Sequence, residues 1–531
     1  MAKFVIKIES ILGGQSSLTY FGKPGQFKNS LAIDPDSEAT TGDNRAGGLL
    51  TPTPSTKLSA FGAGSGIDDE PLWMQTNPKD DNVSVYDRAG KIYSIPLATY
   101  SISDRNNGVA LSSSTGNGME YYDNYMYFAK NTDICRLGPL NGVNTIVETY
   151  WTSTLSKSPL GNGVTYPSPK IGTSKYPNHP MHRHVDGKLY IGDVMAGNGA
   201  STGKGAVHFI KTTKTTVEGD TNNGSTYNAL DLSYGVWPTD IESYGIDLAI
   251  SGFEGSTSVG NTTGKKAKIY FWDTTSDSFY KEVELPDPMC SALENVNGVL
   301  YTFSGNPGDL GVRICRFVGG YSFEEIAYLE DSQLPFPGAT SHLLSRVLFG
   351  GHSASMGNYG SLYALGSKIG GISSGLFNIM RSSTPVGTGV TVTSVAVPEN
   401  TDFVNPTYLI GWRDGNEYGV DRNATTYGIA KWISENYRIG KEFEIQEIRI
   451  PVAQAIAADM TVAVKILVDN ESTSTTVGTI NNTSYSASER QIVMRPSVRG
   501  KHDFELAFDW SGTALLSLGL PIEIIGETLE D

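Results

Sequence analysis

Charged side chains and cysteines are both scarce in this chain of 531 residues. Only 18% of the residues are charged, against roughly 25% in an average globular protein. The chain has three cysteines: Cys135, Cys290 and Cys315. They lie far apart and never form a C-x-x-C pair, which excludes a disulfide framework and a zinc motif. We therefore expect all three to be small buried core residues with free thiols.

Long apolar runs and an excess of basic residues are also missing. No run approaches the ~20 apolar residues that span a bilayer as a helix. The N-terminus holds one short apolar alternation and no apolar core of signal-peptide length, so we expect no export through a signal peptide. The net charge of -16 argues against general nucleic-acid binding, because basic side chains must displace the counterions of the phosphates.

Glycine is plentiful, with 60 residues, and Ser, Thr, Asn and Tyr are common. This composition suits short strands and many turns, and it excludes long helical or coiled-coil architecture. Hydrophobic residues at 39% and aromatic residues at 10% are enough to form a core. The sequence therefore predicts an all-β protein.

A weak repeat runs through the middle of the chain. A turn rich in Asp, Asn and Gly is followed by two apolar strands, and such turns recur near positions 124, 187, 247, 298 and 346. A repeat of this kind is typical of propeller blades, in which each four-stranded sheet packs on its neighbours around a ring. We predict a degenerate β-propeller of about six or seven blades over residues 61–383, with a stacked array of β-sandwiches as the alternative.

The C-terminal part, residues 384–531, has a different texture. Phe504, Leu506, Phe508 and Trp510 alternate with other residues, which is typical of a strand with one buried face. About eight such strands predict a jelly-roll-like β-sandwich. Short helices are expected only around 426–436 and 454–460.

Residues 1–60 are predicted to form an extended N-terminal arm. They hold too many apolar side chains to stay in water, yet the Gly, Pro, Ser and Thr between them prevent a compact domain. The strand expected at Lys3–Glu9 would satisfy its backbone by joining an exposed sheet edge, in an assembly or on this chain's own C-terminal domain. Deleting residues 2–45 is expected to leave the propeller folded and to prevent incorporation into the assembly.

Residues with metal-binding chemistry occur in two places. His179, His182 and His184 lie close together, and the last two would share one face of a strand. No carboxylate or cysteine pattern completes a metal site there. The stretch Asp34–Glu38 resembles the start of a calcium loop, but it lacks the central glycine and the distal glutamate.

Catalytic patterns are equally incomplete. The G-x-S-x-G match at Gly371–Gly375 is not followed by the helix that a nucleophile elbow needs, and Gly203–Gly205 lacks the Ser or Thr of a phosphate loop. Asp240 and Glu242 would share a strand face, and Asp68–Glu70 form an acidic cluster, but such pairs are common by chance. We therefore assign no catalytic, cofactor-binding or metal residues.

Three stretches resemble virion structural proteins encoded by tailed bacteriophages. They run from Ile11 to Asp36, from Leu72 to Pro78 and from Tyr437 to Glu523. The resemblance is one of texture over most of the chain, so no functional residue is carried over from it. It implies that a propeller and a jelly-roll-like sandwich serve as scaffold and docking modules.

These observations lead us to expect a non-enzymatic structural component of a tailed-phage virion. It would lie in the tail as a rigid docking scaffold, contribute to host attachment, and be made in the host bacterial cytoplasm. The expected partners are other virion proteins, through the arm and the sandwich, further copies of the chain, and a host surface glycan. We expect no nucleic acid, no membrane insertion and no cofactor.

Two other functions stay open. One is a carbohydrate-active, glycosidase-like propeller enzyme with an appended sugar-binding sandwich. Its mark would be a funnel of convergent carboxylates with an Arg or Tyr at the propeller axis. The other is a bacterial surface adhesin, which the missing export signal disfavours.

Overall fold

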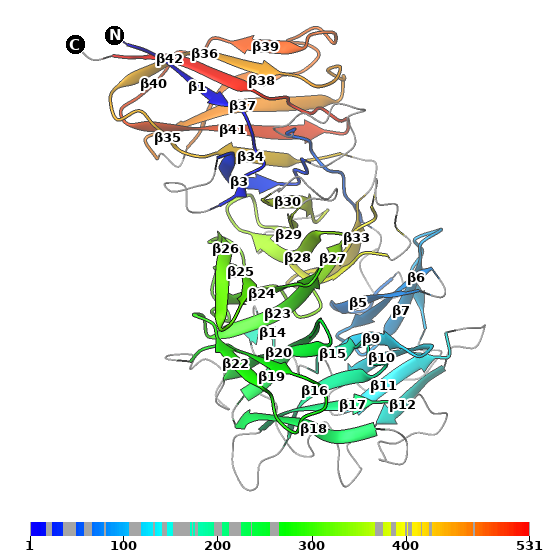
Figure 1. Cartoon of the computed structure of the whole chain (residues 1–531). Coiled ribbons are helices and arrows are strands. Elements are labelled where there is room, and N and C mark those ends of the chain that lie inside the picture. The colour runs from blue at the N-terminus through cyan, green and yellow to red at the C-terminus, as the bar shows by residue number, and fades with distance from the viewer. Residues whose placement is uncertain are drawn as a thin grey trace.

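The computed structural model consists of a ring of β-sheets with a two-sheet region at one end (Figure 1). It describes residues 2–16, 24–35, 49–57, 66–78, 81–105, 118–130, 133–140, 146–151, 170–171, 174–175, 179–195, 204–211, 225–234, 236–254, 265–366, 375–383, 389–398, 401, 406–415, 417–423, 427–470 and 473–529.

The ring contains seven four-stranded sheets within this described part of the chain, here called blades one to seven. Blade one has β5 (Pro71–Asn77), β6 (Asn82–Asp87), β7 (Ile92–Pro96) and β8 (Ser103–Asp104); blade two has β9 (Met119–Tyr122), β10 (Tyr125–Lys130), β11 (Asp133–Gly138) and β12 (Ile146–Trp151). Blade three has β15 (Met181–Arg183), β16 (Leu189–Met195), β17 (Lys204–Ile210) and β18 (Ser225–Tyr234); blade four has β19 (Val236–Tyr244), β20 (Asp247–Glu254), β21 (Lys268–Trp272) and β22 (Lys281–Glu284).

The remaining blades follow in chain order, apart from one strand. Blade five has β23 (Met289–Val296), β24 (Val299–Gly305), β25 (Val312–Gly319) and β26 (Ser322–Leu329); blade six has β27 (Thr340–Leu343), β28 (Arg346–Ser353), β29 (Tyr359–Leu365) and β30 (Leu376–Arg381). Blade seven has β31 (Thr391–Ala396), β32 (Leu409–Asp414), β33 (Glu417–Arg422) and, from the N-terminal part of the chain, β4 (Thr56–Lys57). A further small hairpin pairs β13 (Lys170–Ile171) with β14 (Ser174–Lys175).

The ring is closed. Each innermost strand contacts the innermost strand of the next blade, and β31 of blade seven contacts β5 of blade one. A closed ring of four-stranded sheets is the architecture of a β-propeller. The predicted domain boundary at residues 383 and 384 is therefore wrong, because residues 391–422 form blade seven. The break in texture at Ser-Ser-Thr-Pro marks only the connection from blade six to blade seven.

The repeated turns join the innermost strand of a blade to its second strand. Asp123 and Asn124 have φ angles of 43° and 69°, and Asn297 and Gly298 have φ angles of 54° and 82°. Two-residue hairpins favour this left-handed backbone because its twist matches that of the flanking strands, and Asn, Asp and Gly adopt it most readily. The turn composition therefore identified these hairpins correctly.

The two-sheet region is built from the C-terminal part of the chain and three N-terminal strands. In one sheet β1 (Lys3–Ile8), β42 (Ile522–Thr528), β36 (Phe443–Pro451) and β39 (Gln491–Met494) are neighbours, and β40 (Val498–Gly500) pairs with β36. The other sheet has the order β2 (Gly14–Gln15), β3 (Gln26–Leu31), β34 (Ala430–Ser434), β41 (Asp503–Gly512), β37 (Met460–Val468) and β38 (Thr475–Ile480), and β35 (Tyr437–Arg438) pairs with β41.

The two sheets share one hydrophobic core. Ile448 and Ile524 of the first sheet and Val464 and Phe508 of the second belong to the same buried cluster. The helices expected around 426–436 and 454–460 are absent from the described residues there, since β34 occupies the first stretch and turns occupy the second. Pairing of β34 with β41 buries Trp432, and this tertiary contact overrides the local helix propensity.

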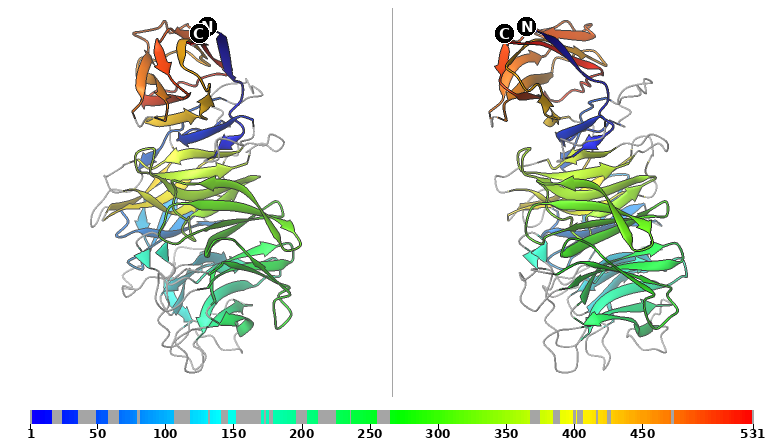
Figure 2. Two further views of the ribbon diagram at one scale, coloured as in Figure 1. Left: turned by 90° about the vertical axis from the view of Figure 1, so that its left-hand side faces the viewer. Right: turned by 60° about the vertical axis from the view of Figure 1, so that its left-hand side comes forward.

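The described parts of residues 1–60 supply strands to the propeller and to the two-sheet region, here called the two bodies. The strand β1 pairs with β42 in antiparallel register, from Lys3 opposite Glu527 to Ile8 opposite Ile522. Next, β3 pairs with β34 and also contacts β30 of blade six, and β4 completes blade seven. Figure 1 shows β3 between β34 and β30, and both views in Figure 2 show the dark-blue β1 beside the C-terminal strands. The N-terminal segment, residues 2–57, thus holds the two bodies together.

All three cysteines are buried with free thiols, which confirms the prediction. Burial raises the pKa of the Cys290 thiol, and it raises the pKa of Cys315 to about 11. Thiols in this state are poor nucleophiles at neutral pH, because the thiolate is the reactive form. The cysteines therefore act as small core residues.

Candidate functional site

Four carboxyl groups and one histidine converge on the axis of the propeller. Glu120 comes from β9, His182 from β15, Asp240 and Glu242 from β19, and Glu294 from β23, and all five line one cavity of about 100 Å³. Alternate residues of a strand point to the same side, which brings both acids of β19 to the axis. The shared face predicted for these two acids is therefore correct.

Asp240 is held by two backbone amides. Its Oδ1 accepts a hydrogen bond of 2.9 Å from the Ile241 N–H, and its Oδ2 accepts one of 2.7 Å from the Leu293 N–H of blade five. The pKa of Asp240 is nevertheless raised to about 8, mainly by burial and also by the neighbouring charge of Glu294. Asp240 is therefore mainly protonated at neutral pH.

Glu242 has the same character. Its Oε1 accepts a hydrogen bond of 2.7 Å from the Ser243 N–H. Burial raises the pKa of Glu242 well above its ordinary value, and the charges of Glu294, Asp240 and Glu120 act in the same direction. Like charges in one desolvated cavity cannot all ionise together. Glu242 therefore also keeps its proton at neutral pH.

His182 faces Glu242 but does not form a charged pair with it. The distance from His182 Nε2 to Glu242 Oε1 is 3.7 Å, whereas Nε2 lies 2.6 Å from the Ser243 hydroxyl. The pKa of His182 is lowered to about 3, mainly by burial and also by the adjacent His184 and Arg183. A neutral imidazole thus lies beside a neutral carboxylic acid at neutral pH.

The opposite situation is found between blades five and six. His342 Nδ1 lies 2.6 Å from Glu294 Oε1, and this hydrogen bond raises the pKa of His342. Glu294 is 7% exposed and lines the same cavity as Glu242, so a hydrogen bond from blade six holds one of the axial carboxyl groups. His342 also lines a second cavity of about 290 Å³, and Met74, Gln75 and Thr340 line both cavities.

This arrangement gathers several carboxyl groups, as acid–base chemistry requires, but it leaves little room for a substrate. A cavity of about 100 Å³ is well below the roughly 300–1,000 Å³ of most small-molecule sites. Neither an Arg nor a Tyr lines it. The axial groups instead link neighbouring blades, because Gln75 Nε2 donates to Glu120 Oε1 at 3.1 Å and Asn295 Nδ2 donates to the Ser243 carbonyl at 2.5 Å.

The three histidines of the 179–184 stretch have separate roles. His179 is fully buried, with Nδ1 3.5 Å from Asp193 Oδ1, and His208 Nε2 lies 3.3 Å from the other oxygen of the same carboxylate. His184 lies 2.9 Å from the Ser243 hydroxyl through Nδ1 and 2.9 Å from the Ile246 carbonyl through Nε2. These contacts join elements within blade three and blade three to blade four.

The acidic motifs found in the sequence make ion pairs. Asp34 pairs with buried Arg346 and so does not begin a calcium loop. In the cluster at 68–70, the acids pair with basic side chains of blades one and seven: Asp68 with Lys91, Asp69 with Arg88, and Glu70 with Arg413. Residues 36–38, Gly203 and residues 371–374 lie outside the described residues.

Sequence reasoning missed Glu120, Glu294 and His342 as members of the axial site. The acids occur three to five residues before the hairpin turn of their blade, as Asp240 and Glu242 do. This offset from the repeated turn is a signal that the sequence did contain. It becomes informative only when the innermost strand of each blade is known.

The described residues offer neither a cluster of metal-ligating side chains nor a membrane-spanning helix. No group of three or more His, Cys, Asp or Glu side chains there is placed to hold a metal ion. No described helix is long and apolar enough to cross a membrane.

The chain matches no family model and no curated protein sequence. Among solved structures, it is similar to the β-propeller domain of Cps50 (Swd1) from Myceliophteria thermophila, with 8% identity over 69% of this chain and 99% of that chain and a TM-score of 0.39. It is also similar to the WD40 repeats of RRP9, with 10% identity over 71% of this chain and 99% of that chain and a TM-score of 0.40. Raptor from Chaetomium thermophilum matches over 70% of this chain and 30% of its own, with 8% identity and a TM-score of 0.41. These distant likenesses say nothing about function, and the propeller assignment rests on the strand order.

Proposed function

We propose that this chain is a non-enzymatic structural component of a tailed-phage virion, located in the tail as a rigid docking scaffold. The resemblance of residues 11–36, 72–78 and 437–523 to virion structural proteins supports this role. An all-β body whose three cysteines are free and buried is compatible with assembly in a bacterial cytoplasm.

The observation that carries the proposal is the way the N-terminal segment joins the two bodies. It supplies strands to both sheets of the two-sheet region and to blade seven of the propeller. Phe27 packs against Phe377 of blade six and Trp432 of β34, with ring centroids 5.4 Å and 5.9 Å apart. A scaffold that must keep two docking surfaces at a fixed distance benefits from such a tie.

The docking surfaces that we infer lie on the two-sheet region and on the propeller. In the two-sheet region, β1 is the edge strand of its sheet, and its Val5 side chain is 53% exposed. On the propeller, Val185 and Ile246 are 74% and 80% exposed at the hairpins of blades three and four. We propose that other virion proteins and further copies of the chain dock on the two-sheet region, and that the loops of the propeller face the host surface.

Antibody labelling of purified phage particles, followed by electron microscopy, tests the proposed role. The label should decorate the tail at a defined position, and the chain should be found by mass spectrometry in the same purified particles. A chain that is abundant in the infected-cell lysate but missing from purified particles would contradict the proposal. Whole particles are used, so the result does not depend on how the isolated chain behaves.

A second function, the carbohydrate-active enzyme, is favoured by the carboxyl groups that converge at the axis. Asp240 or Glu242, whose pKa values are raised by burial, would act as the acid, and Glu294, held by His342, would be the second carboxyl group. The narrow cavity argues against it. Incubation with bacterial polysaccharides, followed by an assay for released reducing ends, would decide whether the chain cleaves them. Activity abolished by Glu294→Gln but kept in Glu284→Gln, a surface control, would establish the enzyme instead.

A further inference from the structure

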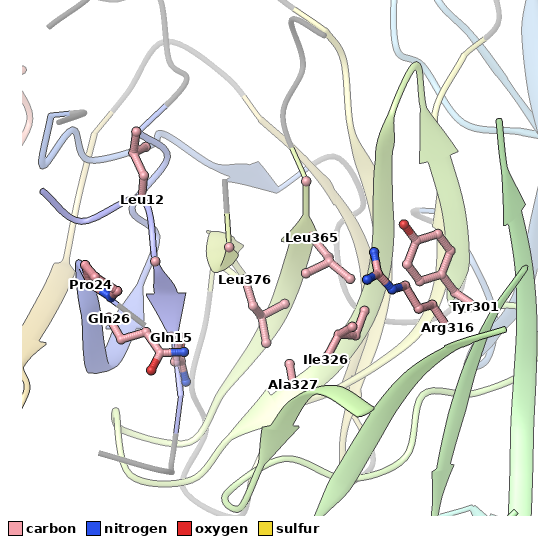
Figure 3. A pocket seen from close by; sticks show the side chains of 13 residues that line it. Leu12, Gln15, Pro24, Gln26, Tyr301, Arg316, Ile326, Ala327, Leu365 and Leu376 are labelled. Carbon is pink, nitrogen blue, oxygen red and sulfur yellow. The ribbon is translucent and has the colours of Figure 1, made fainter. Parts of the chain in front are cut away.

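A cavity of about 380 Å³ lies between the N-terminal segment and blades five and six (Figure 3). Its volume falls within the range of small-molecule sites, unlike that of the axial cavity. Blade five supplies β24 to β26, blade six supplies the ends of β29 and β30, and β2 and β3 lie opposite. The lining residues used below are Gln15, Gln26, Tyr301, Arg316, Ile326, Leu365 and Leu376.

Arg316 keeps part of its hydrogen-bonding capacity for this cavity. Its Nε and Nη2 contact Glu324 Oε2 at 2.8 Å and 2.7 Å. Its Nη1 makes no hydrogen bond to any residue in the described ranges. Figure 3 shows the guanidinium group directed towards Leu365, across the cavity. The cavity therefore holds a cationic donor that is only partly used.

Tyr301 adds a second donor beside the first. It lies directly opposite Arg316 in the pairing of β24 with β25. Its hydroxyl also has no hydrogen-bond partner within the described part of the chain. Burial raises the pKa of Tyr301, with a smaller opposing effect from Arg316, so the hydroxyl keeps its proton and can donate.

The rest of the lining is mixed. Ile326, Leu365 and Leu376 provide aliphatic walls, and Gln15 and Gln26 bring side-chain amides from the N-terminal segment. Gln15 Nε2 donates to Asn29 Oδ1 at 2.9 Å, and Gln15 Oε1 accepts from the N–H and the hydroxyl of Ser30 at 3.3 Å each, so the second Nε2 proton is the donor left for a ligand. Donors at one end, amides at the other and aliphatic walls between them suit a small ring with both polar and C–H surfaces.

We propose that this cavity binds a small hydroxylated carboxylate, the chemical class of the sugar acids. The carboxylate accepts charge-assisted hydrogen bonds from Arg316 Nη1 and from the Tyr301 hydroxyl. The ring packs its C–H face on Leu365 and Leu376, and its hydroxyl groups reach the amides of the N-terminal segment. The proposed binding site does not depend on the virion role. The ligand titration below therefore does not decide the virion role, and the labelling of phage particles does not decide the binding site.

Nuclear magnetic resonance titration of the full chain with four probes tests this site. D-glucuronic acid, D-glucose and D-glucosamine share a ring and differ in charge, and acetate carries the charge without the ring. Glucuronic acid should bind most tightly, with glucose at least about tenfold weaker, since one charge-assisted hydrogen bond contributes about that factor. Equal binding of acetate would reduce the site to a plain anion site, and preferential binding of glucosamine or no binding at all would overturn the proposal.

Substitutions then locate the binding. Arg316→Gln should weaken the binding of glucuronic acid at least about tenfold and leave the binding of glucose unchanged. Glu324→Gln should strengthen the binding of glucuronic acid, because it removes the carboxylate that competes with the ligand for the Arg316 guanidinium group. Arg495→Gln, whose side chain is 79% exposed elsewhere on the surface, is the control. Arg316 is 48% exposed, so its variant should fold; a folded variant that binds as well as the wild type would place the ligand elsewhere.

Discussion

At the scale of single residues, the buried pair Asp34–Arg346 joins the N-terminal segment to blade six. Arg346 is fully buried, and its Nη2 and Nη1 donate to the two carboxylate oxygens of Asp34 at 2.7 Å and 3.2 Å. Its Nη1 also lies 3.5 Å from the Tyr408 hydroxyl. Removing one partner of a buried ion pair is strongly destabilising, because the remaining charge stays out of bulk water.

We predict that Asp34→Asn lowers the free energy of unfolding by about 3–5 kcal/mol. The double variant Asp34→Leu with Arg346→Met should recover most of this loss, since an apolar pair removes the unpaired charge. Urea unfolding followed by tryptophan fluorescence measures both. Lys266→Met is the control, because its partner Glu284 is 53% exposed and such surface pairs contribute roughly 0–1 kcal/mol. Equal effects in the buried and surface variants would contradict the assignment.

The axial acids predict how stability depends on pH. Both Asp240 and Glu242 have raised pKa values, so between about pH 6.5 and 8 the folded chain keeps protons that the unfolded chain has already lost. The free energy of unfolding should therefore fall as pH rises, by up to about 1.4 kcal/mol per pH unit for each retained proton. The raised pKa of His342 acts in the same direction. The lowered pKa of His182 acts in the opposite direction, and its effect fades as pH rises above the ordinary histidine pKa of about 6.5.

Glu242→Gln isolates one contribution to this dependence. The glutamine can still accept the Ser243 N–H but cannot titrate, so stability should fall less steeply with pH and exceed that of the wild type at pH 8. Denaturant midpoints measured at half-unit steps from pH 6.5 to 9 give the slopes. Glu284→Gln, at the surface, should keep the wild-type slope. If Glu242→Gln and Glu284→Gln show the same slope of stability against pH, Glu242 is not a source of the pH dependence.

At the scale of elements, β3 is the strand that connects the two bodies. It pairs with β34 and contacts β30, and Phe27, only 1% exposed, packs between them. Phe27→Ala should cost about 3–5 kcal/mol, as truncation of a buried aromatic side chain usually does. Val5→Ala in β1 removes an apolar group that is 53% exposed and should cost less than about 0.5 kcal/mol. Thermal unfolding of the two variants under one condition makes the comparison, and a small effect at Phe27 would show that β3 is dispensable.

At the scale of the whole molecule, the structure changes the expected outcome of deleting residues 2–45. That deletion removes β1 to β3, the Phe27 ring and the counter-ion of Arg346, and it leaves β4 in place. We now expect the truncated chain to unfold at a lower temperature in two separate steps, one for the propeller and one for the two-sheet region. Differential scanning calorimetry with limited proteolysis would detect both steps. An unchanged unfolding profile would show that the segment is only an external arm.

Local patterns explain which elements could be predicted. The hairpin turns at 124 and 298 were identifiable because left-handed backbone selects Asn and Gly directly. The strand at 503–512 was identifiable because its alternation reports one buried face. By contrast, the helix expected around 426–436 failed, since the pairing of β34 with β41 is a long-range contact.

The candidate site also has features that local spacing predicts and features that only long-range contacts decide. Asp240 and Glu242 could be placed on one face, because spacing along a strand is a local property. Their convergence with Glu120 and Glu294 depends on three blades meeting at the axis, which no local pattern encodes.

The sequence by itself determined the all-β class, the repeated blades with their turns, and the free state of the buried cysteines, because composition and short-range spacing are sufficient for each. Only the tertiary structure decided how the ring closes, since its seventh blade combines residues 391–422 with residues 56–57. The same holds for the tie between the two bodies, in which Asp34 meets Arg346 and β1 meets β42. These contacts join residues hundreds of positions apart, and their partners are selected by the packing of the whole chain.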